Sequence, residues 1–103
     1  MSPRLQLLIE AVEGLPHDPF PQYGLALEYK GLGRREEAVE TFRTLMEGHP
    51  DYVPAYLQAG MVLMDLGRAD QARAVLERGV EVAGRKGDGH ARSELMAALA
   101  SLS

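Results

Sequence analysis

The sequence predicts an all-α fold built from antiparallel helical hairpins, and two observations carry this prediction. First, Leu-Gly-Arg occurs twice, and a 34-residue interval separates Gly33 from Gly67 as it separates Ala38 from Ala72. Second, apolar residues over positions 19–32 recur at spacings of three, four and seven, which is helical periodicity. A single hairpin of this size cannot bury its own apolar face, so the repeat predicts hairpins that stack on each other.

Composition limits the classes of function. The chain has 103 residues, with 15 acidic and 11 basic side chains and a net charge of −4, and it has no cysteine. We expect one domain, no nucleic-acid partner because the basic residues form no block, and no disulfide or thiolate metal site. The apolar patch Leu7–Ile9 is interrupted by Glu10 and Glu13, and the longest apolar run has six residues, Leu95 to Ala100. We therefore expect no signal peptide, no membrane contact and a cytoplasmic location.

Six helices are expected in order along the chain. They cover about residues 3–14, 19–31, 35–47, 53–66, 69–83 and 92–100. Gly33 and Gly67 are expected to take the left-handed conformation that ends a helix and lets the chain reverse. Glu36, Glu37 and Asp70 fall in the first turn of the helix that follows each glycine, where the helix dipole favours negative charge.

Aspartates are expected to cap the first helix of each hairpin. Asp18 and Asp51 each stand three residues before a proline, Pro21 or Pro54, and proline is tolerated in a first helical turn. The two aspartates are one position closer together than the two turn glycines. This difference predicts that one first helix is a residue longer than the other.

The 34-residue helix-turn-helix period resembles the tetratricopeptide repeat. The resemblance rests on small residues at Ala26/Gly60 and Ala38/Ala72 and on large ones at Tyr29/Leu63 and Phe42/Leu76. Pro50 fits the proline that closes such a repeat, although Gly84 takes its place in the second copy. Asp-Pro-Phe at 18–20 and Gly-Val-Glu-Val-Ala at 79–83 also look like small stand-alone bacterial members of the family. The resemblance implies a short right-handed solenoid.

The same period divides the chain into full and half repeats. We expect a single tetratricopeptide domain over residues 1–103, with a half-repeat helix at 1–18, full repeats at 19–52 and 53–86, and a capping helix at 87–103. Two periods after Ala26, Glu94 is expected in the slot that Gly60 also occupies. A charge there suits an end cap, on which no further helix packs.

The resemblance implies a non-catalytic module that binds a protein or peptide partner across the first helices of successive repeats. On this chain the expected groove residues are Phe20, Tyr23, Leu27, Lys30, Leu57, Met61, Met64, Ala91, Arg92 and Leu95. Aromatic and methionine side chains suit an apolar peptide or a partner helix. The alternative is that several of these residues simply belong to the core.

One known binding mode of the family is missing from the sequence. Relatives that grip an acidic C-terminal tail use Lys and Asn side chains where this chain has Tyr23, Leu27 and Gln58. Arg92 alone is weak evidence for a carboxylate partner, so a chaperone tail is not expected.

Self-association is the alternative function. The first helix carries Leu5, Leu7 and Ile9, and it is more apolar than the corresponding segments of the two full repeats. An apolar solenoid end invites a second copy, and symmetric dimers are the commonest closed assembly. The sequence leaves monomer and homodimer open.

No catalytic, cofactor or metal site is expected. His17, His49 and His90 lie in predicted loops or at a helix start, without the spacing of metal ligands. Glu36 and Glu37 are adjacent on a helix, so their side chains point in different directions and do not form a carboxylate pair.

Overall fold

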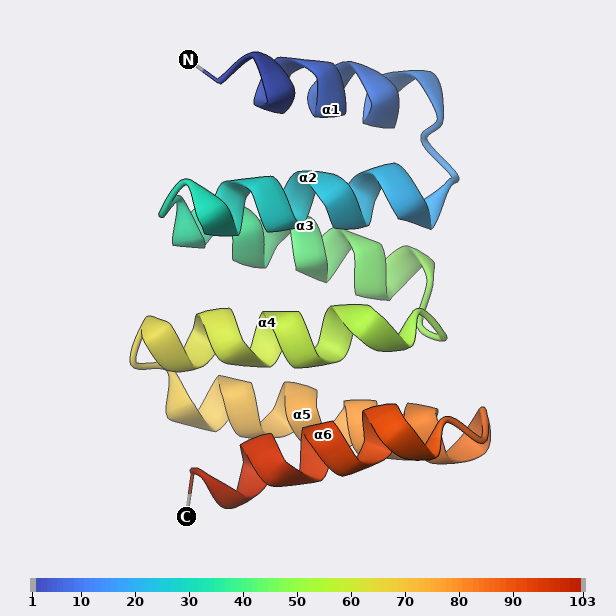
Figure 1. Ribbon diagram of the computed structural model, residues 1–103, viewed down its shortest axis with the longest axis vertical. Helices are drawn as coiled ribbons and strands as arrows, with labels where there is room; N and C mark the ends of the chain where they lie inside the picture. The colour runs from blue at the N-terminus through green and yellow to red at the C-terminus, as the bar shows by residue number, and fades with distance from the viewer. Residues whose placement is uncertain (1, 103) are drawn as a thin grey trace.

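The computed structural model describes residues 2–102. That part of the chain forms six α-helices and no β-strand: α1 (Pro3–Gly14), α2 (Pro19–Gly31), α3 (Arg35–Gly48), α4 (Val53–Asp65), α5 (Ala69–Arg85) and α6 (Gly89–Ala100). Successive helices run in opposite directions and stack along the long axis, with the termini at opposite ends (Figure 1). The predicted all-α fold is confirmed.

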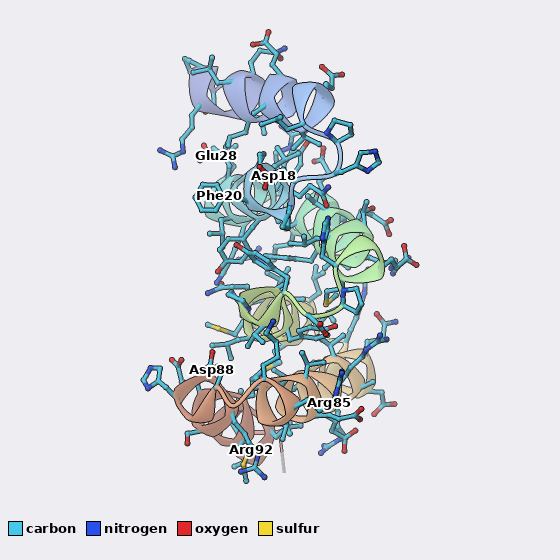
Figure 2. The ribbon with its side chains drawn as sticks, turned by 90° about the vertical axis from the view of Figure 1, so that its right-hand side faces the viewer. Asp18, Phe20, Glu28, Arg85, Asp88 and Arg92 are labelled. Atoms are coloured by element: carbon cyan, nitrogen blue, oxygen red, sulfur yellow. The ribbon has the colours of Figure 1, made fainter. Side chains whose placement is uncertain are left out.

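The helices lie on two sides of the stack. Viewed from the side, α2, α4 and α6 lie on one side and α3 and α5 on the other (Figure 2). Helix α4 contacts α2, α3, α5 and α6, while α1 contacts α2 alone within the described residues. Helix α4 is therefore the centre of the fold, and α1 and α6 form its two ends.

The small residues of the repeat are where neighbouring helices approach most closely. Ala26, Ala38 and Ala72 are fully buried. At Gly60 of α4, a Cβ atom would lie 2.4 Å from Cδ2 of Leu76 on α5, which is far inside van der Waals contact. The small and large positions of the repeat thus interlock as the sequence predicts.

Left-handed glycines end the first helix of both hairpins. Gly33 has φ 75° and Gly67 has φ 73°. After α2, the amide of Arg34 donates to the carbonyl of Tyr29 at 2.9 Å, and the same bond pattern follows α4, which is the Schellman arrangement. A third left-handed glycine, Gly87 with φ 72°, ends α5 in the same way and was not expected.

One of the two predicted aspartate caps is wrong. Asp18 caps α2, and its Oδ1 accepts a hydrogen bond from the amide of Phe20 at 3.0 Å. The N-cap of α4 is Tyr52, without a side-chain cap bond, and Asp51 lies in the preceding turn with a carboxylate oxygen 4.0 Å from Arg85. Helices α2 and α4 are equal in length, so neither first helix is longer.

The last two helices depart from the 34-residue period. The N-caps Asp18 and Tyr52 stand one period apart, but the next N-cap, Asp88, comes two positions later than the period places it. Helix α5 is longer than α3, because Gly84 stands where Pro50 closes the first repeat and does not stop the helix. Each residue of α6 therefore occupies a helix position two places earlier than a strict period predicts.

Candidate functional site

The shift of α6 changes the place of Leu95, which was predicted on an open surface of the groove. The seventh residue after the N-cap is Leu25 in α2, Ala59 in α4 and Leu95 in α6, and all three side chains are buried. The side chain of Leu95 is only 1% exposed and packs in the core beside α5. Its assignment to an open surface was wrong, since the sequence period did not include the two extra residues.

The same shift moves Arg92 and Glu94. Arg92 lies beside Gly84 of α5, where a Cβ atom would be 3.8 Å from the Arg92 Cδ and Nε atoms, and Figure 2 places Arg92 at the α6 end of the stack. Arg92 is therefore not a groove residue. Glu94, predicted at the position of Gly60, instead corresponds to Gln58, and Met96 takes the Gly60 position.

The remaining predicted groove residues lie on α2 and α4. Phe20 is 72% exposed and Met61 is 40% exposed, and both are among the large apolar side chains that the described chain leaves open to solvent. The others are half-buried: Tyr23, Leu27, Lys30, Leu57 and Met64. Several of these pack one edge against the core, so the alternative of core residues is correct in part.

The side chains at equivalent positions of α2 and α4 form rows across the two helices. Leu57 follows Tyr23 by one period, and Met61 follows Leu27 by the same interval. Lys30 Nζ donates to Gln58 Oε1 at 2.7 Å and so joins α2 to α4. We call the surface formed by Phe20, Tyr23, Leu27, Leu57 and Met61, with the adjoining face of α6, the first-helix groove.

A cavity of about 320 Å³ lies at the α6 end of this groove. Its apolar wall comes from Tyr23 of α2, from Val53, Pro54 and Leu57 of α4, and from Ala91 and Leu95 of α6. Its polar lining includes Gln58, Asp88, His90 and Glu94. The sequence prediction missed the last three because their place depends on the length of α5, and the only sequence signal was the Asp88 cap after Gly87.

Tyr23 is held in place by aromatic neighbours. Its ring centroid lies 5.4 Å from that of Tyr52 and 6.3 Å from that of Phe42. Burial raises the pKa of the Tyr23 hydroxyl above its usual 10.0, and the nearby Tyr52 raises it further. The wall of the cavity is therefore a fixed aromatic surface that stays uncharged at neutral pH.

A second hollow, between α3 and α5, was not predicted. Cavities of about 460 Å³ and 310 Å³ share the lining residues Arg43, Met46, Ala74 and Val75. It opens because α3 and α5 make no close backbone contact in the described part of the chain. Its rim carries the cations Arg43 and Arg78 and the anion Glu47, so its charges favour no single class of ligand.

Helix α1 offers less apolar surface than the sequence suggests. Leu5 is only 2% exposed, and its assignment to a self-association surface is therefore wrong. Leu7 is 66% exposed and Ile9 is half-buried. Arg4 stands one 34-residue period before Ala38, at the position where the second helix of a full repeat packs on its first helix. The Arg4 Nε atom lies 3.0 Å from Glu28 Oε1. This ion pair joins α1 to α2.

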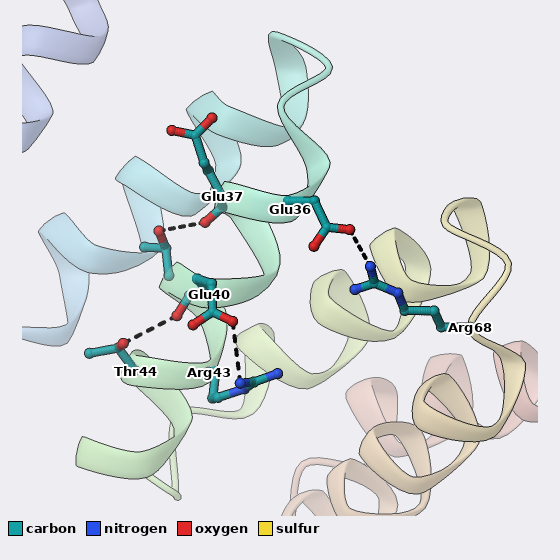
Figure 3. Close-up of polar contacts among 7 residues, drawn as sticks. Glu36, Glu37, Glu40, Arg43, Thr44 and Arg68 are labelled. Atoms are coloured by element: carbon teal, nitrogen blue, oxygen red, sulfur yellow. Dashed lines mark hydrogen bonds and ion pairs between the residues drawn. The ribbon is translucent and has the colours of Figure 1, made fainter.

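Acidic side chains take part in structural pairs. Glu36 pairs with Arg68 of the following turn, as Figure 3 shows, whereas Glu37 accepts two hydrogen bonds of 2.6 Å from Arg34. These bonds to Arg34 lower the pKa of the Glu37 carboxyl. Residues 2–102 contain no group of three His, Cys, Asp or Glu side chains placed to hold a metal ion. None of their helices is long and apolar enough to cross a membrane.

Comparisons with known proteins agree with this architecture. The family profile described as tetratricopeptide repeat matches residues 29–99. The tetratricopeptide repeat domain protein from Salinibacter ruber, solved in solution by NMR, is 36% identical, with a TM-score of 0.79 over 84% of this chain and 88% of that chain. No curated protein sequence matches the chain.

Two more distant structures share the fold. The TPR2B-domain:pHsp70 complex of yeast Sti1 matches with a TM-score of 0.89 at 16% identity, over 95% of this chain and 78% of that chain. Protein BPP2914 from Bordetella parapertussis matches with a TM-score of 0.84 at 22% identity, over 99% of this chain and 89% of that chain. Together with the profile match over more than half of its length, these results show that the chain belongs to the tetratricopeptide repeat family.

Proposed function

We propose that the chain is a non-catalytic protein-interaction module that binds a peptide or helix of a partner protein in the first-helix groove. The observation that carries this proposal is the exposure of Phe20 and Met61 on neighbouring parallel helices. Large apolar side chains left open on adjacent helices suit the anchors of a bound peptide. A related fold, the TPR2B domain of yeast Sti1, is found in complex with pHsp70.

The size of the groove sets the expected strength of binding. Burying one large apolar side chain contributes roughly 1.5–3 kcal/mol, while association costs on the order of 4–15 kcal/mol. Only a few such side chains are open on α2 and α4, so an isolated peptide should bind at roughly micromolar affinity. We also propose that the first repeat spans residues 19–52 and that the second, predicted to end at residue 86, extends to the N-cap Asp88. We further propose a cytoplasmic location.

Self-association is the second candidate, and the exposure of Leu7 on α1 favours it. The burial of Leu5 and the charge of Arg4 reduce the apolar area available for a dimer on this helix. Stable interfaces bury about 800 Å² per partner, far more than one leucine supplies. A homodimer would therefore need further surface, such as the first-helix groove itself.

One capture experiment distinguishes the two proposed functions, with wild type, a groove variant and a control variant as the three bait proteins. Phe20→Gln with Met61→Gln removes the open apolar groove side chains without adding charge, and Leu7→Gln is the matched control on α1. Light scattering first gives the mass of each bait, and circular dichroism confirms the helices. Proteins from source-cell lysate are then captured on each bait in parallel.

A partner that binds wild type and Leu7→Gln but not the groove variant supports the proposed function. A wild-type dimer that becomes monomeric in Leu7→Gln, with no foreign protein captured by any bait, supports self-association instead. A partner retained equally by all three baits would exclude the first-helix groove as its binding site.

A further inference from the structure

The cavity at the α6 end of the first-helix groove has an excess of negative charge. Asp88 caps α6, with Oδ1 accepting from the amide of Ala91 at 3.0 Å, and Glu94 Oε1 lies 3.3 Å from His90 Nε2. No arginine or lysine of the described chain lines the cavity. Within residues 2–102, the only basic side chain within 4.0 Å of the Glu94 carboxylate is His90, which is 88% exposed, and Asp88 has no such neighbour.

Lys30, Arg92 and Arg85 each have another contact or lie on another side of the stack. Lys30 Nζ is bonded to Gln58 Oε1 at 2.7 Å, between α2 and α4. Arg92 lies beside Gly84 on α5, and Figure 2 shows Arg85 on the opposite side of the stack from Asp88. Among residues 2–102, neither Asp88 nor Glu94 forms an ion pair with an arginine or lysine.

Negative charge also reaches the neighbouring part of the groove. Asp18 caps α2 and occupies the position that Asp88 occupies on α6. Burial raises the pKa of the Tyr52 hydroxyl, and Asp18 raises it further. Tyr52 lies next to Tyr23, which forms part of the cavity wall.

We propose that the partner segment bound in the first-helix groove carries a lysine or arginine side chain that enters this cavity. Its aliphatic stem would lie on Tyr23 and Leu57, and its cationic head would donate hydrogen bonds to the carboxylates of Asp88 and Glu94. Long basic side chains cover apolar surface in this way while their charge stays at a polar rim. Bonds between cations and carboxylates are stronger than neutral ones, and an aromatic ring nearby adds attraction for the cation.

The inference rests on the proposed function and specifies the chemical class of the partner segment, which is an apolar peptide with a basic side chain. It differs from the acidic-tail binding that other members of the family show, because acids line this cavity. The charge pattern belongs to this chain, since it follows from the two extra residues that bring Asp88, His90 and Glu94 into the groove.

The test is a selection from a random-peptide phage library on immobilised wild type, followed by fluorescence polarisation with the enriched peptides. Asp88→Asn with Glu94→Gln removes both carboxylates, and asparagine keeps the N-cap because it caps as well as aspartate. The matched control is Glu77→Gln with Glu81→Gln, which removes two exposed carboxylates from α5 and changes the net charge equally. Each enriched peptide is also measured against Phe20→Gln with Met61→Gln.

We expect enriched peptides to carry a lysine or arginine next to apolar residues. Their affinity should fall about tenfold in Asp88→Asn with Glu94→Gln, and it should stay unchanged in the control. Replacing the basic residue of such a peptide by glutamine should cause the same loss against wild type and little loss against the cavity variant.

Two other outcomes separate failure of the inference from failure of the proposed function. Peptides that require Phe20 and Met61 but lack a basic residue, or that bind the cavity variant as well as wild type, overturn the inference and leave the proposed function standing. If no peptide is enriched, or if the enriched peptides bind both the groove variant and the cavity variant as well as wild type, the proposed function fails and the inference fails with it.

Discussion

Leu95 of α6 packs directly on Gly79 of α5, and the contact leaves no room for a side chain on the glycine. A Cβ atom at Gly79 would lie 2.9 Å from Leu95 Cδ2 and 2.6 Å from Cβ of Tyr56 on α4. Gly79 is thus the point where three helices meet. This contact holds α6 against the stack and so forms the α6 end of the first-helix groove.

Gly79→Ala should therefore destabilise the protein. Overpacking costs typically about 1–3 kcal/mol, and the roughly 1 kcal/mol that alanine gains in helix propensity offsets only part of it. The matched control is Gly31→Ala, whose added Cβ meets no heavy atom of the described residues within 4 Å and should be neutral or stabilising. Urea unfolding of both variants measures the difference. Equal stability of the two would contradict the packing of α6 described above.

The two aspartates that precede α2 and α4 should respond differently to alanine. Asp18→Ala removes the bond to the Phe20 amide and should cost about 0.5–2 kcal/mol of unfolding free energy. Asp51→Ala removes an exposed side chain whose ion pair with Arg85, at 4.0 Å, should contribute at most about 1 kcal/mol. Thermal unfolding followed by circular dichroism compares them. If Asp51→Ala proved the more destabilising, Asp51 and not Tyr52 would be the functional cap of α4.

The tyrosines should make the protein less stable at alkaline pH. The pKa of Tyr23 is raised in the folded state, chiefly by burial and then by Tyr52, so the unfolded chain loses this proton first as pH rises. The contribution of Tyr23 is complete below the unfolded-state pKa of 10.0 and is lost as pH rises through the folded-state pKa. Unfolding free energy measured from pH 8 to pH 11 should fall less steeply in Tyr23→Phe than in wild type. An identical slope would show that Tyr23 titrates as an exposed residue.

Much of the fold could be predicted from the repeat itself. The interval between Gly33 and Gly67 marks two equivalent turns, and the small residues Ala38 and Ala72 mark the buried faces of α3 and α5. Such positions are predictable because a left-handed turn and a close helix crossing each tolerate few residue types. The bounds of α1 to α4 follow closely from these signals.

The position of α6 could not be predicted in the same way. A repeat period assumes equal helix lengths, but α5 continues past Gly84 to Arg85 because no proline stops it. The two extra residues bury Leu95 and turn Arg92 toward α5, and they bring Glu94 into the cavity. Glycine weakens a helix without ending it, so its effect at position 84 depends on the tertiary contacts of α5 and α6.

The most direct test of the central claim is site-specific photocrosslinking in source cells. Phe20→p-benzoylphenylalanine places the probe in the first-helix groove, and Leu7→p-benzoylphenylalanine places it on the exposed face of α1. The account predicts an adduct with a different protein from position 20 and none from position 7. Adducts only of this chain with itself, or foreign adducts from position 7 alone, would contradict the groove as the site of partner binding.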